Sequence, residues 1–478
     1  MRTENEASGT IRLRRGIDYR KIIVLWLLLV ALLVALQMFW NRSKMAGKLQ
    51  EALAELDRSD PGWRLEDIEA ARDKMPDEEN SAQVLIEATQ HLSQPWPPLG
   101  FPQEPFHIVP PNELLDESDF DRLSRGLESV KSVLAMAGKL ADMPRGRYRL
   151  QYGINPIATP LVDQNQSQRI VSILAFESMK WNHTGESRKA LTVCRAALNA
   201  ARSLGDEPIF RSQMLRSSLA VFVCEAIERT LGQGEPPPED MSILQKLLES
   251  EDAFPGLLIA MRGTRATLNK VLERVEHGEV SVDELLPRGS DWLERTSLAM
   301  SFMDTREDHA LLLSMMTRRV KEVQRPMQEQ AALEQHFEEE VHHLPETAIL
   351  SRTLLPAVFQ TGEIFRRKHA LLRCAIASLA AERCRRDKKA WPDNADQLCP
   401  QYLSAVLLDP YDGKPLRYRR VEDGVIIYSV GQDVVDDGGN LNRDQRRSWG
   451  VDIGFRLWDV AKRRQPARPK PHPADMPR

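Results

Sequence analysis

The chain has 478 residues, enough for two or three domains with cores of their own. Its formal net charge of -4 gives no long-range attraction toward nucleic acid, so a nucleic-acid partner is not expected. Hydrophobic residues make up 42% and aromatic residues only 6%, and the chain is rich in Ala, Leu, Glu and Arg. This composition favours a mainly α-helical fold over a large β-architecture.

Residues 22–40 form an apolar run, IIVLWLLLVALLVALQMFW, in which Gln37 is the only strongly polar member. As an α-helix the run spans about 28 Å, close to the thickness of the bilayer hydrocarbon. Trp40 stands where an interfacial aromatic belongs. A cleaved signal peptide is the alternative, but its apolar region is normally shorter and ends at a small-residue cleavage site. The run therefore predicts an uncleaved, single-pass transmembrane anchor.

Positive charges predict the orientation of this anchor. More of them precede the run than follow it: Arg2, Arg12, Arg14, Arg15, Arg20 and Lys21 before it, and Arg42, Lys44 and Lys48 after it. The more positive flank normally stays in the cytoplasm. We therefore expect residues 1–21 in the cytoplasm, residues 22–40 in the inner membrane, and the bulk of the chain outside the cytoplasm.

Residues 43–355 are expected to form a helical domain. Asn80 follows acidic residues and is expected to cap a helix start. Residues 190–204 carry the clearest apolar stripe at helical spacing, and helices over 167–181 and 209–231 flank it. These segments predict antiparallel helical hairpins with a surface for a protein partner. Their spacing resembles that of tetratricopeptide repeats, but the consistent period and signature residues of those repeats are missing.

Residues 92–111 hold seven prolines interleaved with aromatic residues, which excludes helix and central strand. A polyproline segment for a partner and a loop pinned to the domain surface are the two interpretations, and we favour the loop. At the other end of the chain, residues 461–478 are basic and proline-rich and predict a disordered tail.

Two groups of side chains are candidates for metal or redox chemistry. His336, Glu340 and His343 share a helical face and could ligate zinc, although a charged helical face explains the same residues. The cysteines are odd in number and form no CxxC pair. We expect Cys194 and Cys374 to be buried, and Cys384 with Cys399 to be the pair best placed for a disulfide. No Walker loop, dinucleotide motif or nucleophile elbow occurs.

Residues 357–459 contain an ordered series of motifs. A long helix with apolar residues from Phe365 to Leu379 ends in a basic run, and Trp391-Pro392 and a short helix over 395–403 follow. Residues 409–415 read DPYDGKP, a turn, and 416–419 and 425–428 predict a β-hairpin. A polar segment, SVGQDVVDDGG over 429–439, leads on to Asp452-Ile453.

This order resembles the C-terminal part of type II secretion major pseudopilins, over about 100 of the 478 residues. The resemblance implies a small α+β module. Asp412 is an insertion in the family's turn, and Val434 replaces its usual glycine. The anchor is also separated from the long helix, whereas a pilus subunit needs the two to be continuous. The chain thus looks like a pseudopilin-like module on a different protein, and as a whole it resembles uncharacterised membrane-anchored bacterial proteins.

Members of that family bind calcium in the corresponding loop. The resemblance implies Asp433 and Asp452 as carboxylate ligands, with Asp436 or Asp437 as a further one. Carboxylates in a glycine-rich loop suit a hard cation, whereas an acidic turn that folds without metal is the alternative. The expected function is a non-enzymatic, membrane-anchored envelope protein with a partner-binding helical domain. An envelope hydrolase and a secretion component that contacts true pseudopilins are the alternatives.

Overall fold

The computed structural model describes residues 19–467 except 73, 93–95, 97–108, 162, 282–283, 286–304, 360 and 442–450. The prediction of a mainly helical fold with a small C-terminal sheet is confirmed. The helices are α1 (Tyr19–Ser59), α2 (Leu65–Ala71), α3 (Ser81–Gln90), α5 (Glu117–Glu128), α6 (Lys131–Ala137), α7 (Gln164–His183), α8 (Ser187–Arg202), α9 (Phe210–Gln233), α10 (Pro238–Asp252), α11 (Gly256–Glu276), α13 (Arg306–Glu322), α14 (Met327–His342), α15 (Ile349–Leu354) and α16 (Thr361–Lys388).

The sheet contains β1 (Arg417–Val421), β2 (Gly424–Ser429) and β3 (Ile453–Trp458) in that spatial order, and both pairings are antiparallel. β1 and β2 form the expected hairpin, in which Val421 pairs with Gly424 across the turn. Gly424 has a φ of +150°, and a Cβ there would overlap the carbonyl oxygen of Leu457 on β3. The turn therefore needs glycine, both for its backbone conformation and for the close approach of the third strand.

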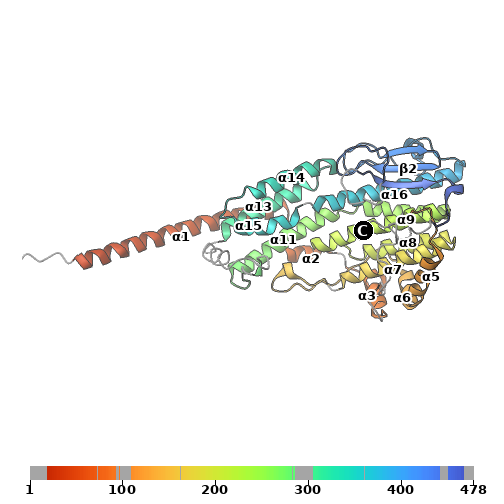
Figure 1. Ribbon diagram of the computed structural model, residues 1–478. Coiled ribbons are helices and arrows are strands. Elements are labelled where there is room, and N and C mark those ends of the chain that lie inside the picture. The colour runs from red at the N-terminus through yellow and green to blue at the C-terminus, as the bar shows by residue number, and fades with distance from the viewer. Residues whose placement is uncertain are drawn as a thin grey trace, which may run out of the picture.

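α1 is one continuous helix that contains both the predicted anchor over 22–40 and the first residues of the predicted helical domain. In Figure 1 its first half, drawn in red, projects from one end of the body, and the sheet lies at the other end. Leu49 and Leu56 on its second half are buried with Trp63 and with Leu313 of α13. Lys48 donates to Glu307 at 2.6 Å beside this contact. The second half of α1 is thus packed into the body.

Within the residues that the structure describes, no helix is long and apolar enough to cross a membrane. The predicted anchor over 22–40 lies in α1, and the side chains of residues 34–35 and 38–39 within it lie outside the described set.

The central layer consists of α7, α8 and α9, which follow one another as hairpins (Figure 1). The turn between α7 and α8 uses Gly185, whose φ is +83°. The apolar stripe of α8 is buried as predicted, including Cys194. Asn80 accepts a hydrogen bond from the Ala82 amide at 3.1 Å and so caps α3, which confirms its predicted use.

The core continues from the helical layer into the C-terminal region without a break at the expected boundary near residue 356. One hydrophobic cluster contains residues of α8, α9 and α10 together with residues of α16 and the sheet. α16 packs on both α9 and α10, and β3 packs on α16 and α9. A second cluster lies among α11, α13, α14 and α15.

The start of the expected disordered tail is packed against the body. Arg463 is buried and donates to Glu382 of α16 at 2.9 Å. Gln465 donates through its amide to the carbonyl oxygen of Asn112 at 2.7 Å. Residues 468–478 of the predicted tail, and most of the proline-rich segment over 92–111, lie outside the described residues.

The cysteine expectations are partly confirmed. Cys194 and Cys374 are buried, as expected. The disulfide between Cys384 and Cys399 is wrong, because all five cysteines are free thiols. Cys384 lies on the buried side of α16, where it packs with the core as a small apolar side chain.

Candidate functional site between α9, α16 and β3

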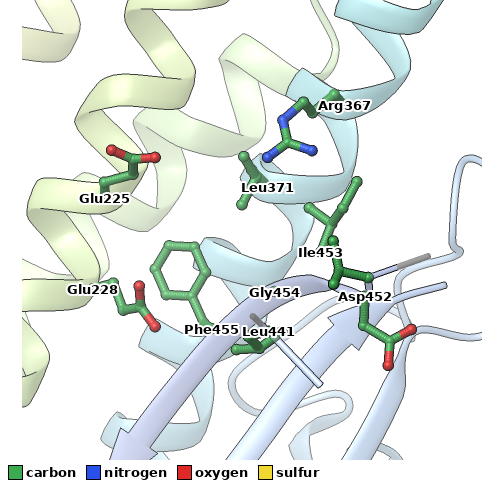
Figure 2. A pocket seen from close by; sticks show the side chains of 10 residues that line it. Glu225, Glu228, Arg367, Leu371, Leu441, Asp452, Ile453, Gly454 and Phe455 are labelled. Atoms are coloured by element: carbon green, nitrogen blue, oxygen red, sulfur yellow. The ribbon is translucent and has the colours of Figure 1, made fainter. Parts of the chain in front are cut away.

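A small, partly open pocket lies where the helical layer meets the sheet, with a volume of about 40 Å³. α9 contributes Glu225 and Glu228, which are one helical turn apart. α16 contributes Arg367 and Leu371, also one turn apart, and Phe455 of β3 lies between the two helices (Figure 2). Because residues at i, i+3 and i+4 share a helical face, each helix presents two side chains to the same pocket.

The α9 wall of the pocket is acidic and built into the fold. Glu228 is only 4% exposed, and its Oε1 accepts a hydrogen bond from the Arg456 amide of β3 at 2.9 Å. That amide lies on the edge of β3 that faces α9, away from β2. Glu228 therefore completes the hydrogen bonding of an edge strand and ties α9 to the sheet. Glu225, one turn before it, is half-buried.

The α16 wall is basic. Arg367 is half-buried and lies beside Leu371, on the side of the pocket opposite Glu225 and Glu228 (Figure 2). Within the described part of the chain, Arg367 forms no hydrogen bond and no ion pair. Its neighbour Arg366, in contrast, is buried and donates to Glu334 at 3.1 Å. The pocket thus contains a guanidinium whose donors have no acceptor among the described residues.

The floor of the pocket is apolar. Phe455 is 1% exposed, and Leu371 and Ile453 are also buried. Leu441 and Val451 complete the apolar lining, and they flank residues 442–450, which lie outside the described residues. An apolar floor between walls of opposite charge is an arrangement that can bind and orient a small polar molecule.

Asp452, one of the predicted calcium ligands, also borders this pocket, but its carboxylate is directed away from α9 (Figure 2). Its Oδ2 accepts a hydrogen bond from the Gly439 amide at 2.7 Å, whereas its buried Oδ1 has no hydrogen-bond partner among the described residues. Burial raises the pKa of Asp452 to about 6, and the nearby carboxylates of Asp436 and Asp437 add to the shift. A buried carboxylate with an unused oxygen is suited to a cation.

Asp437 is exposed, whereas Asp433 and Asp436 accept hydrogen bonds from their own loop and from the neighbouring strand β2. Asp433 accepts from the Val435 amide at 3.1 Å, and Asp436 accepts from the Gly438 amide and the Tyr428 hydroxyl, both at 2.9 Å. Arg417 of β1 lies 3.8 Å from Asp436. Nowhere in the described ranges do three or more metal-ligating side chains converge. Of the predicted ligands, Asp452 therefore has the donor chemistry for calcium, while the full set is not assembled.

The side chains considered as zinc ligands, His336, Glu340 and His343, contact other groups of the protein. His336 lies 3.6 Å from Glu340, and Glu340 also accepts from Arg318 at 3.0 Å. His343 contacts the carbonyl oxygen of Glu339 through Nδ1 at 2.7 Å. Glu340 therefore serves an ion pair between α13 and α14, which agrees with the charged-face interpretation.

Sequence reasoning did not single out Glu225, Glu228, Arg367 or Phe455. The only local signals were the spacing of the two glutamates and the position of an arginine on the apolar stripe of α16. Neither reveals that α9 and α16 face each other across a strand that follows in the chain. Comparison with family models, with curated proteins and with solved structures gives no match to this chain.

Proposed function

We propose that this is a single-pass, membrane-anchored envelope protein that holds a helical, partner-binding body and a pseudopilin-like α+β module outside the cytoplasm. The observation that carries the proposal is the surface of the first half of α1. Large apolar side chains are exposed there on every side of the helix, from Ile23 to Leu36, and Leu25 is 72% exposed. Such a surface is costly in water and favourable in a bilayer.

The distribution of apolar residues changes along α1, and this change supports the same proposal. After Trp40 the helix becomes amphipathic, and its apolar residues Leu49 and Leu56 face the body. A helix that is apolar all round over one half and amphipathic over the other is suited to leave a membrane and dock onto its own domain.

The anchor is tested by alkaline carbonate extraction of membranes from cells that express the full chain. We expect the wild-type chain to stay in the membrane pellet and the double variant Leu28→Arg/Leu32→Arg to be extracted. Each arginine at the centre of a spanning helix costs roughly 2.5–3.5 kcal/mol.

The matched control replaces exposed apolar residues elsewhere in the chain, as in Ile243→Arg/Val435→Arg. This variant should remain in the pellet. Extraction of the wild-type chain together with both variants would contradict the anchor.

We favour ligand binding over the alternative of an envelope hydrolase. A pocket in which a histidine converges with carboxylates would favour the hydrolase. The described lining of the pocket between α9, α16 and β3 has carboxylates and an arginine but no histidine. This lining supports binding of a small molecule or side chain.

We also propose a calcium site at the loop around Asp452. Two observations favour this site: the buried Oδ1 of Asp452 has no partner among the described residues, and the carboxylates of Asp436 and Asp437 lie nearby. A bound calcium would neutralise these charges and fill the vacant acceptor. Calcium should then raise the melting temperature of the wild-type chain but not that of Asp452→Asn. The control is magnesium at equal concentration, and equal shifts in both proteins would point to nonspecific binding.

A further inference from the structure

A larger, partly open cleft of about 850 Å³ lies between the second half of α1, the start of α13 and the segment that precedes α15. It is at the end of the body where α1 enters beside α13, away from the sheet (Figure 1). α1 forms its long wall with residues at three- and four-residue spacing: Met45, Lys48, Ala52 and Glu55. This spacing puts them on one helical face. From residue 45 to residue 58 the wall is about 20 Å long, enough for a second helix to lie along it.

The apolar part of the lining is made mostly of short side chains. It contains Met45, Ala52, Ala310, Leu311, Pro345 and Ala348. The wall before α15 is held in place by Asp308, which accepts the amides of Leu350 at 2.6 Å and Ser351 at 3.1 Å. The cleft is therefore preformed, with apolar contact area and with room between its walls.

The charges of the cleft favour a basic ligand. Lys48 pairs with Glu307 at 2.6 Å, and Arg58 pairs with Glu55 at 2.7 Å. Glu51 lies on α1 between these two pairs and is exposed, and no hydrogen bond or ion pair joins it to another residue that the structure describes. An acidic ligand thus finds both basic side chains already paired, whereas a basic ligand finds an unpaired carboxylate.

A second copy of the chain fits this wall poorly. Two copies anchored in one bilayer would hold their α1 helices parallel and at equal height. Parallel helices that pack in register place each contact position opposite the same position of the partner. Lys48 would then face Lys48, and Glu55 would face Glu55, so that like charges repel each other along the whole contact.

We propose that this cleft binds a basic helix of a different protein, which lies along α1 and places a Lys or Arg side chain at Glu51. In recognition of this kind, apolar contacts at helical spacing give affinity and charges at the rim give orientation. The inference deepens the proposed partner-binding function and rests on it. Because α1 is continuous from Trp40, the partner helix would lie from about 8 Å to about 27 Å beyond the apolar run, near the membrane surface.

The test uses the purified full chain in dodecyl maltoside and two fluorescein-labelled model helices of equal length, one of Ala and Lys and the other of Ala and Glu. Fluorescence anisotropy, with empty micelles as the blank, should show binding of the Ala–Lys helix and at least tenfold weaker binding of the Ala–Glu helix. Equal binding of both, or no binding of the Ala–Lys helix, would overturn the proposal. Carbonate extraction reports separately on the anchor, so this failure is distinguishable from failure of the anchor.

Three variants separate the cleft from the overall charge of the chain. Glu51→Lys should weaken binding of the Ala–Lys helix at least tenfold, because it replaces the unpaired carboxylate by a like charge. The control Glu78→Lys makes the same change at an exposed position of the 3-10 helix Asp77–Glu79 and should leave binding unchanged. Ala52→Trp fills the cleft and should abolish binding.

Circular dichroism verifies that each variant is folded. Full binding of the Ala–Lys helix by folded Glu51→Lys and folded Ala52→Trp would contradict the assignment to this cleft. Light scattering tests the other occupant. A stable dimer of the wild-type chain that Ala52→Trp converts to a monomer would assign the cleft to a second copy and would also contradict the proposal.

Discussion

Glu207 is a fully buried carboxyl, and among the described residues no basic side chain lies at hydrogen-bond distance from it. The amide of Gln164 donates to it at 3.2 Å. Burial is the main cause that raises the pKa of Glu207 to about 7, from an ordinary value of 4.5. Between these two values the folded chain keeps a proton that the unfolded chain has lost. The free energy of unfolding therefore falls as pH rises through this interval and is level above it.

The first prediction concerns this residue. Glu207→Gln removes the charge but keeps a hydrogen-bonding side chain, so it should flatten the pH dependence of stability between pH 4.5 and 7. Because the pKa rises from 4.5 to about 7, the variant should be more stable than wild type at pH 8 by about 3 kcal/mol.

Urea unfolding at a series of pH values measures this effect. The exposed control Glu346→Gln makes the same change of charge on the surface and should retain the wild-type pH profile. An unchanged profile for Glu207→Gln would show that Glu207 does not titrate in this range.

At the scale of elements, four helices meet at the end of α10. Glu251 is 1% exposed and accepts from Arg216 of α9 at 2.6 Å, with Arg202 of α8 at 3.4 Å and Lys368 of α16 at 3.8 Å. Asp252 beside it accepts from Arg373 of α16 at 3.0 Å. One pair of acids thus compensates basic side chains from three helices.

The second prediction follows from this junction. Glu251→Ala leaves Arg216 and Lys368 buried without their counter-charge, which should destabilise the fold by about 3–5 kcal/mol. The control is Glu239→Ala, which breaks an ion pair with Arg188 in which both side chains are 64% exposed. That loss should cost at most about 1 kcal/mol. Chemical denaturation compares the two, and similar midpoints would contradict a structural role for the junction.

The sequence predicted individual helices, caps and turns better than it predicted contacts between residues that are far apart in the chain. The stripe on α8, the cap at Asn80 and the β1–β2 hairpin depend on local spacing and turn residues, and these are confirmed. Glu251 and Arg216 lie on different helices, and nothing in their local sequence indicates that they meet. The same holds for Glu228, whose partner amide lies on β3 more than 200 residues later.

At the scale of the whole molecule, the C-terminal module and the helical layer share one core. α16 buries most of its surface between α9, α10 and the sheet, and Phe365 at its start belongs to the second core. A boundary drawn near residue 356 therefore cuts through packed side chains. The order of its sequence motifs predicted a separate module, but residues 357–459 share a hydrophobic core with the helical layer.

The third prediction concerns this shared core. A fragment of residues 357–467 should fail to fold alone, because it exposes the apolar face of α16 that α9 and α10 cover. Circular dichroism and proton NMR of the fragment measure this, with residues 41–467 as the folded control. A fragment with dispersed amide signals and cooperative melting would show an autonomous module.

The continuity of α1 has a mechanical consequence. Residues 41–59 continue the helix for about 28 Å beyond the apolar run, without a proline or glycine pair to act as a hinge. Asp60, directly after the helix, pairs with Arg262 of α11 at 2.8 Å, and Lys48 pairs with Glu307 of α13. If the first half of α1 spans the bilayer, its tilt sets the tilt of the entire body, and the sheet is held at a fixed height at the end farthest from the lipid surface.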